Sequence, residues 1–84
     1  MSNYFFFDPG MTDIDTVIFG PGEMAVQIVA NASKTWCVTR DTDNDGINDI
    51  LREFFNANRK ANVFSVQVYT EDEFRAMWNG SDDE

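Results

Sequence analysis

The sequence predicts a small α+β domain with a mainly antiparallel sheet of about five strands, one long amphipathic helix and a short C-terminal helix. The chain has 84 residues, enough for one hydrophobic core. Several short β-branched or aromatic runs are separated by turn-forming residues, and one segment has the apolar spacing of a helix. We expect residues 1–79 to form a single domain and residues 80–84 to form a disordered acidic tail.

Four strands are predicted before the long helix. Residues 3–7 (NYFFF) end at the turn-forming sequence DPG, and residues 16–19 (TVIF) end at GPG. In residues 24–30 (MAVQIVA) an apolar residue recurs at every second position, which favours a strand, with a short helix as the alternative. Residues 35–39 (TWCVT) are β-branched and aromatic, as is typical of a strand.

The long helix is predicted from apolar residues at the spacing i, i+3, i+4, i+7, i+8, which places them on one helical face. These residues are Ile47, Ile50, Leu51, Phe54 and Phe55. We expect the helix to end near residues 58–62, where the basic Arg59 and Lys60 suit the negative end of the helix dipole.

A strand and a short helix are predicted to complete the domain. The run 63–69 (VFSVQVY) alternates strictly, so we expect Phe64, Val66 and Val68 to point inward. Thr70 and Glu73 have the spacing of a capping box, which opens a helix with an apolar stripe. The stripe consists of Phe74, Met77 and Trp78. Both helices are expected to pack on one face of the sheet.

The charge of the chain restricts its partners. Fifteen acidic residues stand against six lysines and arginines, and there is no histidine, so the formal net charge of −9 barely changes between about pH 6 and 8. Nucleic acid and anionic membranes repel such a chain. The favoured partners are cations and basic protein surfaces, including surfaces that hold DNA or RNA.

The sequence also predicts the cellular compartment. Cys37 is the one cysteine and has no partner for an internal disulfide. The first ten residues lack the basic and long apolar regions of a secretory signal, and no apolar run approaches the roughly 20 residues that span a bilayer. We therefore expect a cytoplasmic protein.

The residue types argue against an enzyme. No histidine is present to activate Cys37 or a serine as a nucleophile. One cysteine without histidine cannot complete a zinc site, and the chain has no GxxxxGK[ST] phosphate loop. We expect a non-enzymatic protein without a cofactor.

The segment DTDNDGIND, from Asp41 to Asp49, has an acidic residue at alternate positions followed by a glycine. Calcium prefers six to eight oxygen ligands, which such a loop can aim at one point. The segment resembles the DxDxDGxxD loops of EF-hand-related and thrombospondin type 3 families. This resemblance implies a calcium site whose ligands are Asp41, Asp43, Asp45 and Asp49, with Gly46 supplying the turn.

Three features of the segment depart from the EF-hand pattern. Arg52 occupies the position of the bidentate glutamate, unless Glu53 replaces it, and a strand precedes the loop where an EF-hand has a helix. Ile47 also lies one position earlier than the usual apolar residue. The alternative is an acidic strand-to-helix connection in which Asp45, Asn48 or Asp49 caps the helix.

The carboxylates form three groups along the chain. The first is Asp8, Asp13 and Asp15; the second is Asp41, Asp43, Asp45, Asp49 and Glu53; the third is Glu71, Asp72 and Glu73. For the third group we favour a role in capping the last helix. Such distributed carboxylates can occupy the lysine and arginine rows with which proteins hold nucleic acid.

The whole-chain profile resembles that of small acidic phage proteins that inhibit bacterial defence, including anti-CRISPR proteins and other DNA mimics. The shared features are length, strong negative charge, missing catalytic residues and an acidic tail, without a common motif. The resemblance implies an inhibitor that binds the DNA-recognition surface of a nuclease or CRISPR effector complex. We expect Asp41, Asp43, Asp45, Asp49, Glu53, Asp13 and Asp15 to contact this partner. The alternatives are a calcium-binding module and an acidic scaffold or interaction protein.

Overall fold

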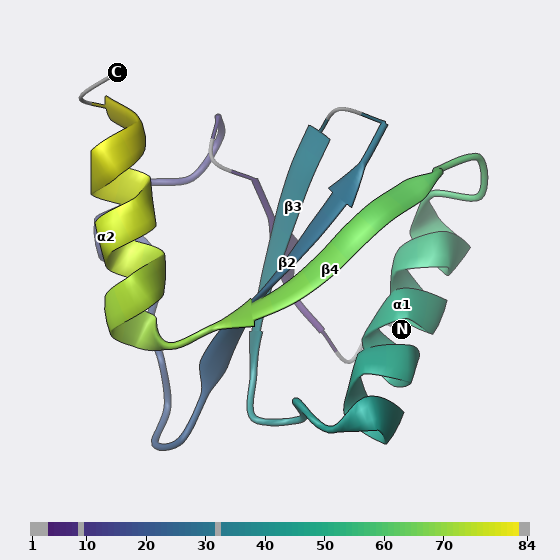
Figure 1. Ribbon diagram of the computed structural model, residues 1–84, viewed down its shortest axis with the longest axis horizontal. Helices are drawn as coiled ribbons and strands as arrows, with labels where there is room; N and C mark the ends of the chain where they lie inside the picture. Colours follow the sequence, from purple (N-terminus) through teal and green to yellow (C-terminus); the bar gives the residue numbers. More distant parts are fainter. Residues whose placement is uncertain (1–3, 9, 32, 83–84) are drawn as a thin grey trace.

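A four-stranded antiparallel sheet forms the centre of the structure, a computed structural model that describes residues 4–8, 10–31 and 33–82, with side chains described up to Trp78 (Figure 1). The strand order is β1-β3-β2-β4. The elements in chain order are β1 (Phe6–Phe7), the 3₁₀ turn η1 (Ile14–Thr16), β2 (Met24–Ala30), β3 (Ser33–Thr39), α1 (Asn44–Ala57), β4 (Val63–Tyr69) and α2 (Glu71–Asp82). The predicted α+β class is therefore confirmed, with four strands in the described residues where about five were expected.

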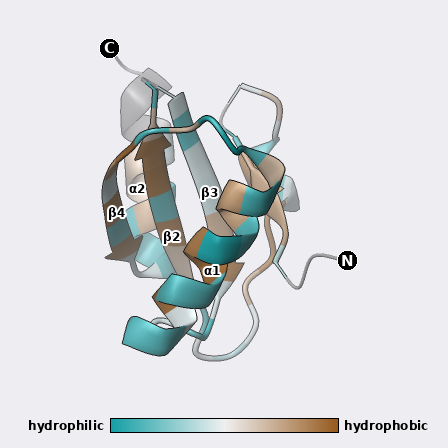
Figure 2. Cartoon of the chain, turned by 90° about the vertical axis from the view of Figure 1, so that its right-hand side faces the viewer, coloured by the Kyte–Doolittle hydropathy of each residue, from teal (hydrophilic) through white to brown (hydrophobic). Residues whose placement is uncertain are grey.

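The two helices pack on opposite faces of the sheet (Figures 1 and 2). Successive residues of a strand point to opposite faces, and β2 has apolar residues in both sets. Val26 and Ile28 pack against α1, whereas Ala25 belongs to the cluster that includes Phe74 of α2. The expectation of one covered face was therefore wrong, because the central strand is buried on both sides.

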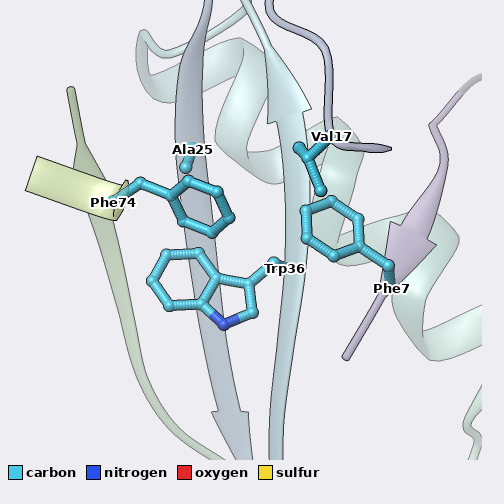
Figure 3. Close-up of a cluster of buried hydrophobic side chains, with 5 residues drawn as sticks. All are labelled: Phe7, Val17, Ala25, Trp36 and Phe74. Atoms are coloured by element: carbon cyan, nitrogen blue, oxygen red, sulfur yellow. The ribbon is translucent and has the colours of Figure 1, made fainter. Parts of the chain in front are cut away.

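Aromatic rings fill the α2 side of the sheet (Figure 3). Phe74 of α2 is fully buried, with its ring centroid 4.9 Å from that of Trp36 and 6.2 Å from that of Phe7. Edge-to-face pairs of this kind contribute about 0.5–1.5 kcal/mol each beyond the area they bury. Phe74 therefore connects α2 to β1 and β3.

The predicted apolar face of α1 is confirmed at four of its five positions. Ile50 and Phe54 are buried against β2, and Ile47 and Leu51 pack around them. Phe55, at the rim of this face, keeps 39% of its surface exposed. The helix begins at Asn44 and ends at Ala57, so Arg59 and Lys60 follow its carboxyl end.

Two expectations for strands were wrong. Residues 16–19 form no strand, since η1 already turns the chain at Ile14–Thr16. Val17 is buried while Ile18 is 82% exposed, and both line an open apolar groove of about 320 Å³ with Phe5 and Val38. Phe64 was expected to point inward, but it is 75% exposed. A register shift in the pairing of β4 with Val29 and Ala30 of β2 interrupts the alternation of side chains at this position.

Cys37 lies in the middle of β3, opposite Val26 of β2 and Phe6 of β1, and it is fully buried. Burial, followed by the negative charges of Glu53 and Glu23, raises the pKa of its thiol from 9.0 to about 12. A nucleophilic cysteine needs its thiolate, which this environment suppresses at neutral pH. Cys37 therefore acts as a small apolar residue of the core.

The buried thiol predicts a measurable pH dependence of stability. Because its pKa is higher in the folded than in the unfolded chain, its contribution is fully present below about pH 9 and is lost as the pH rises toward 12, at up to about 1.4 kcal/mol per pH unit. We expect the stability of the wild type relative to Cys37→Ala to fall between about pH 9 and 11. Urea unfolding across this range measures the difference, and parallel pH profiles for the two proteins would contradict the assignment.

Candidate acidic interface

The strand register brings three acidic segments to one end of the sheet. Met24 lies opposite Thr39, and Ala25 lies opposite Tyr69, so β2 begins where β3 and β4 end. Both helices begin at this same end, which is the lower end in Figure 1. We term this surface the acidic end and define it by Glu23, Asp41, Asp43, Asp45, Glu71, Asp72 and Glu73.

Asp43 caps α1, whereas the sequence had suggested Asp45, Asn48 or Asp49 for this role. The Asp43 carboxylate accepts a hydrogen bond from the backbone N–H of Gly46 at 2.8 Å. Its neighbour Asp41 accepts a hydrogen bond from the hydroxyl of Tyr4 at 3.2 Å. Both carboxylates are exposed and favourably placed near the positive end of the helix dipole.

Gly46 lies inside the helix rather than in a metal-binding turn. A Cβ atom at this position would lie 2.3 Å from the carbonyl oxygen of Asp41, so only glycine lets the two backbone segments approach. Its φ angle is not in the left-handed region. The glycine of the DxDxDG pattern is thus explained by close backbone packing.

The four aspartates of the expected calcium loop do not converge. Asp45 and Asp49 lie on successive turns of α1, and among the described residues no three acidic, cysteine or histidine side chains gather closely enough to hold a metal ion. A calcium loop instead wraps its ligands around one point. The observed geometry fits a capped strand-to-helix connection.

We therefore expect calcium to leave the thermal stability of the protein unchanged. A site with a dissociation constant of about 1 mM, among the weakest known, would add about 1 kcal/mol at 5 mM calcium and raise the Tm by about 4–8 °C. Thermal unfolding with calcium and with a chelator provides the measurement. A Tm difference in this range would contradict the geometry.

A negative flank continues from the acidic end along α1. Asp45, Asp49 and Glu53 are spaced four residues apart, so they lie along one side of the helix. Asp49 forms an exposed ion pair with Arg52 at 2.8 Å, which contributes little to stability in water. Burial, then the charge and hydrogen bond of Asp41 and the charge of Asp49, raise the pKa of Tyr4 to about 12. The negative fields of the loop and the helix therefore overlap at Tyr4.

The start of α2 has the predicted capping box. The backbone N–H of Thr70 donates to the Glu73 carboxylate at 3.0 Å, and that of Glu73 donates to the Thr70 hydroxyl at 3.1 Å. Arg75 pairs with Glu71 at 3.1 Å and also donates to the carbonyl oxygens of Ile14 and Val17. The third acidic group therefore caps the helix, while its side chains remain exposed at the acidic end.

Asp13 and Asp15 lie apart from the α1 carboxylates. Asp13 caps η1 by accepting a hydrogen bond from the N–H of Asp15 at 3.0 Å. Ile14, between them, packs in the cluster on the α2 side of the sheet. The seven predicted contact residues therefore divide between the two faces of the sheet.

The opposite end of the sheet is basic. There Ala30 lies opposite both Ser33 and Val63, and the side-chain oxygen of Asn31 accepts a hydrogen bond from the N–H of Asn62 at 3.2 Å. Neither of the segments 31–34 and 57–62 contains an acidic residue. The basic residues at this end are Lys34, Arg59 and Lys60. These two loops therefore carry charge opposite in sign to that of the acidic end.

The structure thus joins Asp41, Asp43 and Asp45 with acidic residues that the sequence analysis did not include in the interface. Glu23, which accepts a hydrogen bond from the N–H of Gly20 at 2.6 Å, was in none of the three groups. For Glu71, Asp72 and Glu73, the third group, a capping role had been favoured. The only available signal was the antiparallel order of the strands, which returns the chain to the same end before each of these segments.

Comparison with known proteins adds no family to this description, since no protein-family model, curated protein or solved structure matches the chain. Among the described residues, no helix has the length and apolar character needed to cross a membrane.

Proposed function

We propose that this protein is a non-enzymatic inhibitor that acts in the cytoplasm of a phage host and binds the basic nucleic-acid-binding surface of a defence protein, as anti-CRISPR proteins and other DNA mimics do. Its partner is the DNA-recognition surface of a CRISPR effector complex. The acidic end, with Asp49 and Glu53 on the adjoining flank of α1, forms the contact. Asp13 and Asp15 contribute to the overall field.

The observation that carries this proposal is the gathering of carboxylates at one end of the sheet. Seven acidic residues from three separate segments lie at this end, with those before and in α1 and those of α2 on opposite faces of the sheet. The nearby basic residues are Arg40, Arg75 and Arg52. Arg40 and Arg75 donate hydrogen bonds to backbone carbonyl oxygens, and Arg52 pairs with Asp49. A concentrated charge of one sign attracts a basic surface and speeds association with it.

The size of the molecule supports a mimic of short duplex DNA. Its longest extent is 33 Å, which is close to one turn of B-form DNA. Over that length a duplex carries about 20 phosphate charges. The protein is less charged than the duplex, but its carboxylates are held on a folded frame and need no ordering when they bind.

Purified CRISPR effector complexes loaded with guide RNA provide the direct test. We expect the protein to reduce their binding to target DNA, more strongly at about 50 mM than at about 200 mM salt, because ionic contacts weaken with salt. DNA binding that persists in every effector complex of a panel, at a large excess of the protein, would contradict the proposal.

Charge-neutralising variants locate the contact surface. We expect Asp41→Asn, Asp43→Asn and Asp45→Asn together to weaken inhibition at least about tenfold, or about 1.4 kcal/mol. Asparagine also caps helices well, so α1 remains stable. The matched control neutralises Asp8, Asp13 and Asp15, also three charges, in the same way and is expected to change inhibition by less than about threefold, since Debye screening limits distant charges. Equal losses in the two variants would show that only net charge matters.

A further inference from the structure

The outer edge of β4 is open. In the described residues β4 pairs with β2 on one side, and no strand pairs with its other side. None of its seven residues is fully buried, whereas most of β2 is. In Figure 1 the strand lies in front of the rest of the sheet, and in Figure 2 it forms the outer boundary beside β2.

This edge lacks most of the features by which proteins prevent strand pairing. Natural edges are short, bear lysine or proline, or are interrupted by a bulge. The other edge of the sheet, β1, has two residues. In contrast, β4 contains no charged residue and no proline, and its register shift affects only the beginning of the strand. The regular part, from Ser65 to Tyr69, keeps a row of backbone groups available for pairing.

We propose that a second copy of this chain pairs antiparallel with the outer edge of β4, which joins two four-stranded sheets into one continuous sheet. The charge at the two ends of the strand favours this occupant. Arg59 and Lys60 precede β4, and Glu71 and Asp72 follow it. Antiparallel pairing places the basic end of each β4 at the acidic end of the other, twice in one two-fold dimer.

The side chains along β4 suit a register centred on Gln67. In that register Gln67 of one copy lies opposite Gln67 of the second copy, and Val66 lies opposite Val68 of the second copy. Val66 and Val68 are half-buried on the α1 side of the sheet, so pairing covers apolar surface that the single chain exposes. At about 0.15 M salt the Debye length is about 8 Å, so salt screens the repulsion between distant negative charges of the two chains more than the attraction between the nearer basic and acidic ends of β4.

Sedimentation equilibrium of the purified protein tests the dimer. We expect reversible dimerisation with a dissociation constant below about 500 μM. The binding is weak because a single strand pair is a small interface. Gln67→Lys places two like charges at the two-fold axis and is expected to raise the dissociation constant at least about tenfold. Ser33→Lys adds the same charge to an exposed position of β3. Its dissociation constant is expected to stay within about twofold of that of the wild type. A monomeric wild type, or equal effects of the two lysines, would overturn the proposal.

A charge exchange tests the proposed orientation. One variant carries Arg59→Glu and Lys60→Glu, so both ends of its β4 are acidic. The other carries Glu71→Lys and Asp72→Lys, so both ends are basic. Each variant alone is expected to dimerise at least about tenfold more weakly than the wild type, whereas their mixture forms a mixed dimer. Circular dichroism confirms that each variant is folded, and the absence of a mixed dimer from two folded variants would exclude the antiparallel arrangement.

Discussion

Replacement of Phe74 by alanine is expected to lower the free energy of unfolding by about 3–5 kcal/mol, the usual cost of removing a fully buried aromatic ring. The ring has no exposed surface and lies within 4.9–6.2 Å, centroid to centroid, of Trp36, Trp78, Phe19 and Phe7. Small domains have about 5–15 kcal/mol of total stability, so this loss is a large share of it. Urea unfolding followed by tryptophan fluorescence measures the effect.

Two further variants make the Phe74 prediction specific. Phe64→Ala is the same chemical change at a residue that is 75% exposed, and at low protein concentration we expect a loss below about 0.5 kcal/mol. Phe74→Leu keeps most of the buried volume and is expected to give an intermediate loss of about 1–2 kcal/mol, which remains measurable if the alanine variant does not fold. Similar losses at Phe74 and Phe64 would contradict the position assigned to α2.

Replacement of Gly46 by alanine is expected to destabilise the protein by about 1–3 kcal/mol, as overpacking does. Alanine normally stabilises a helix interior by about 1 kcal/mol relative to glycine, so the expected sign is opposite to that of helix propensity. The reason is the 2.3 Å approach of a Cβ atom to the Asp41 carbonyl oxygen, which forces the loop away from the helix. Urea unfolding of the purified variant measures the change.

Asn48→Ala is the matched control for Gly46. Asn48 is exposed on the same helix, two residues later, and alanine there is expected to stabilise α1 by a few tenths of a kcal/mol. A stabilising Gly46→Ala would contradict the close approach of the Asp41 backbone to the helix. The position of the acidic end would then need revision, because Asp41 and Asp43 belong to that loop.

The regular elements were largely predictable because their patterns are local. Apolar spacing predicted α1, alternation predicted β2 and β4, and the Thr70–Glu73 pair predicted the start of α2. Each of these signals depends on residues no more than eight positions apart. These local patterns therefore predicted α1, β2, β4 and the start of α2, and with them the α+β class.

The arrangement of the elements depended on contacts that no local pattern contains. In β2 the second set of side chains contains the apolar Ala25 and Val29 around Gln27, and only the packing of α2 reveals that both faces are covered. The segment 16–19 has strand composition, but η1 and the contacts of Arg75 hold it as irregular chain. Phe64 loses its inward position through a register shift with a strand more than 30 residues away.

Some residues of the candidate interface were predicted, but the other segments that lie at the same end of the sheet were not. The aspartates between Asp41 and Asp45 were identified, but as parts of a calcium loop or of one local patch. Their association with Glu23 and with the start of α2 depends on the strand register, which joins segments about 20–50 residues apart in the sequence. Glu53 and Asp49 extend the surface because α1 begins at the acidic end.

The central position of β2 also has a consequence for synthesis on the ribosome. The strand pairs with β3 through a tight connection at Asn31, but its other edge is completed by β4 and one of its faces by α2, the last two elements of the chain as described. A nascent chain that has emerged only as far as Asn62 therefore has a half-formed sheet with exposed apolar residues. Cooperative folding must await emergence of α2, so the nascent intermediate is a point at which chaperone binding or aggregation competes with folding.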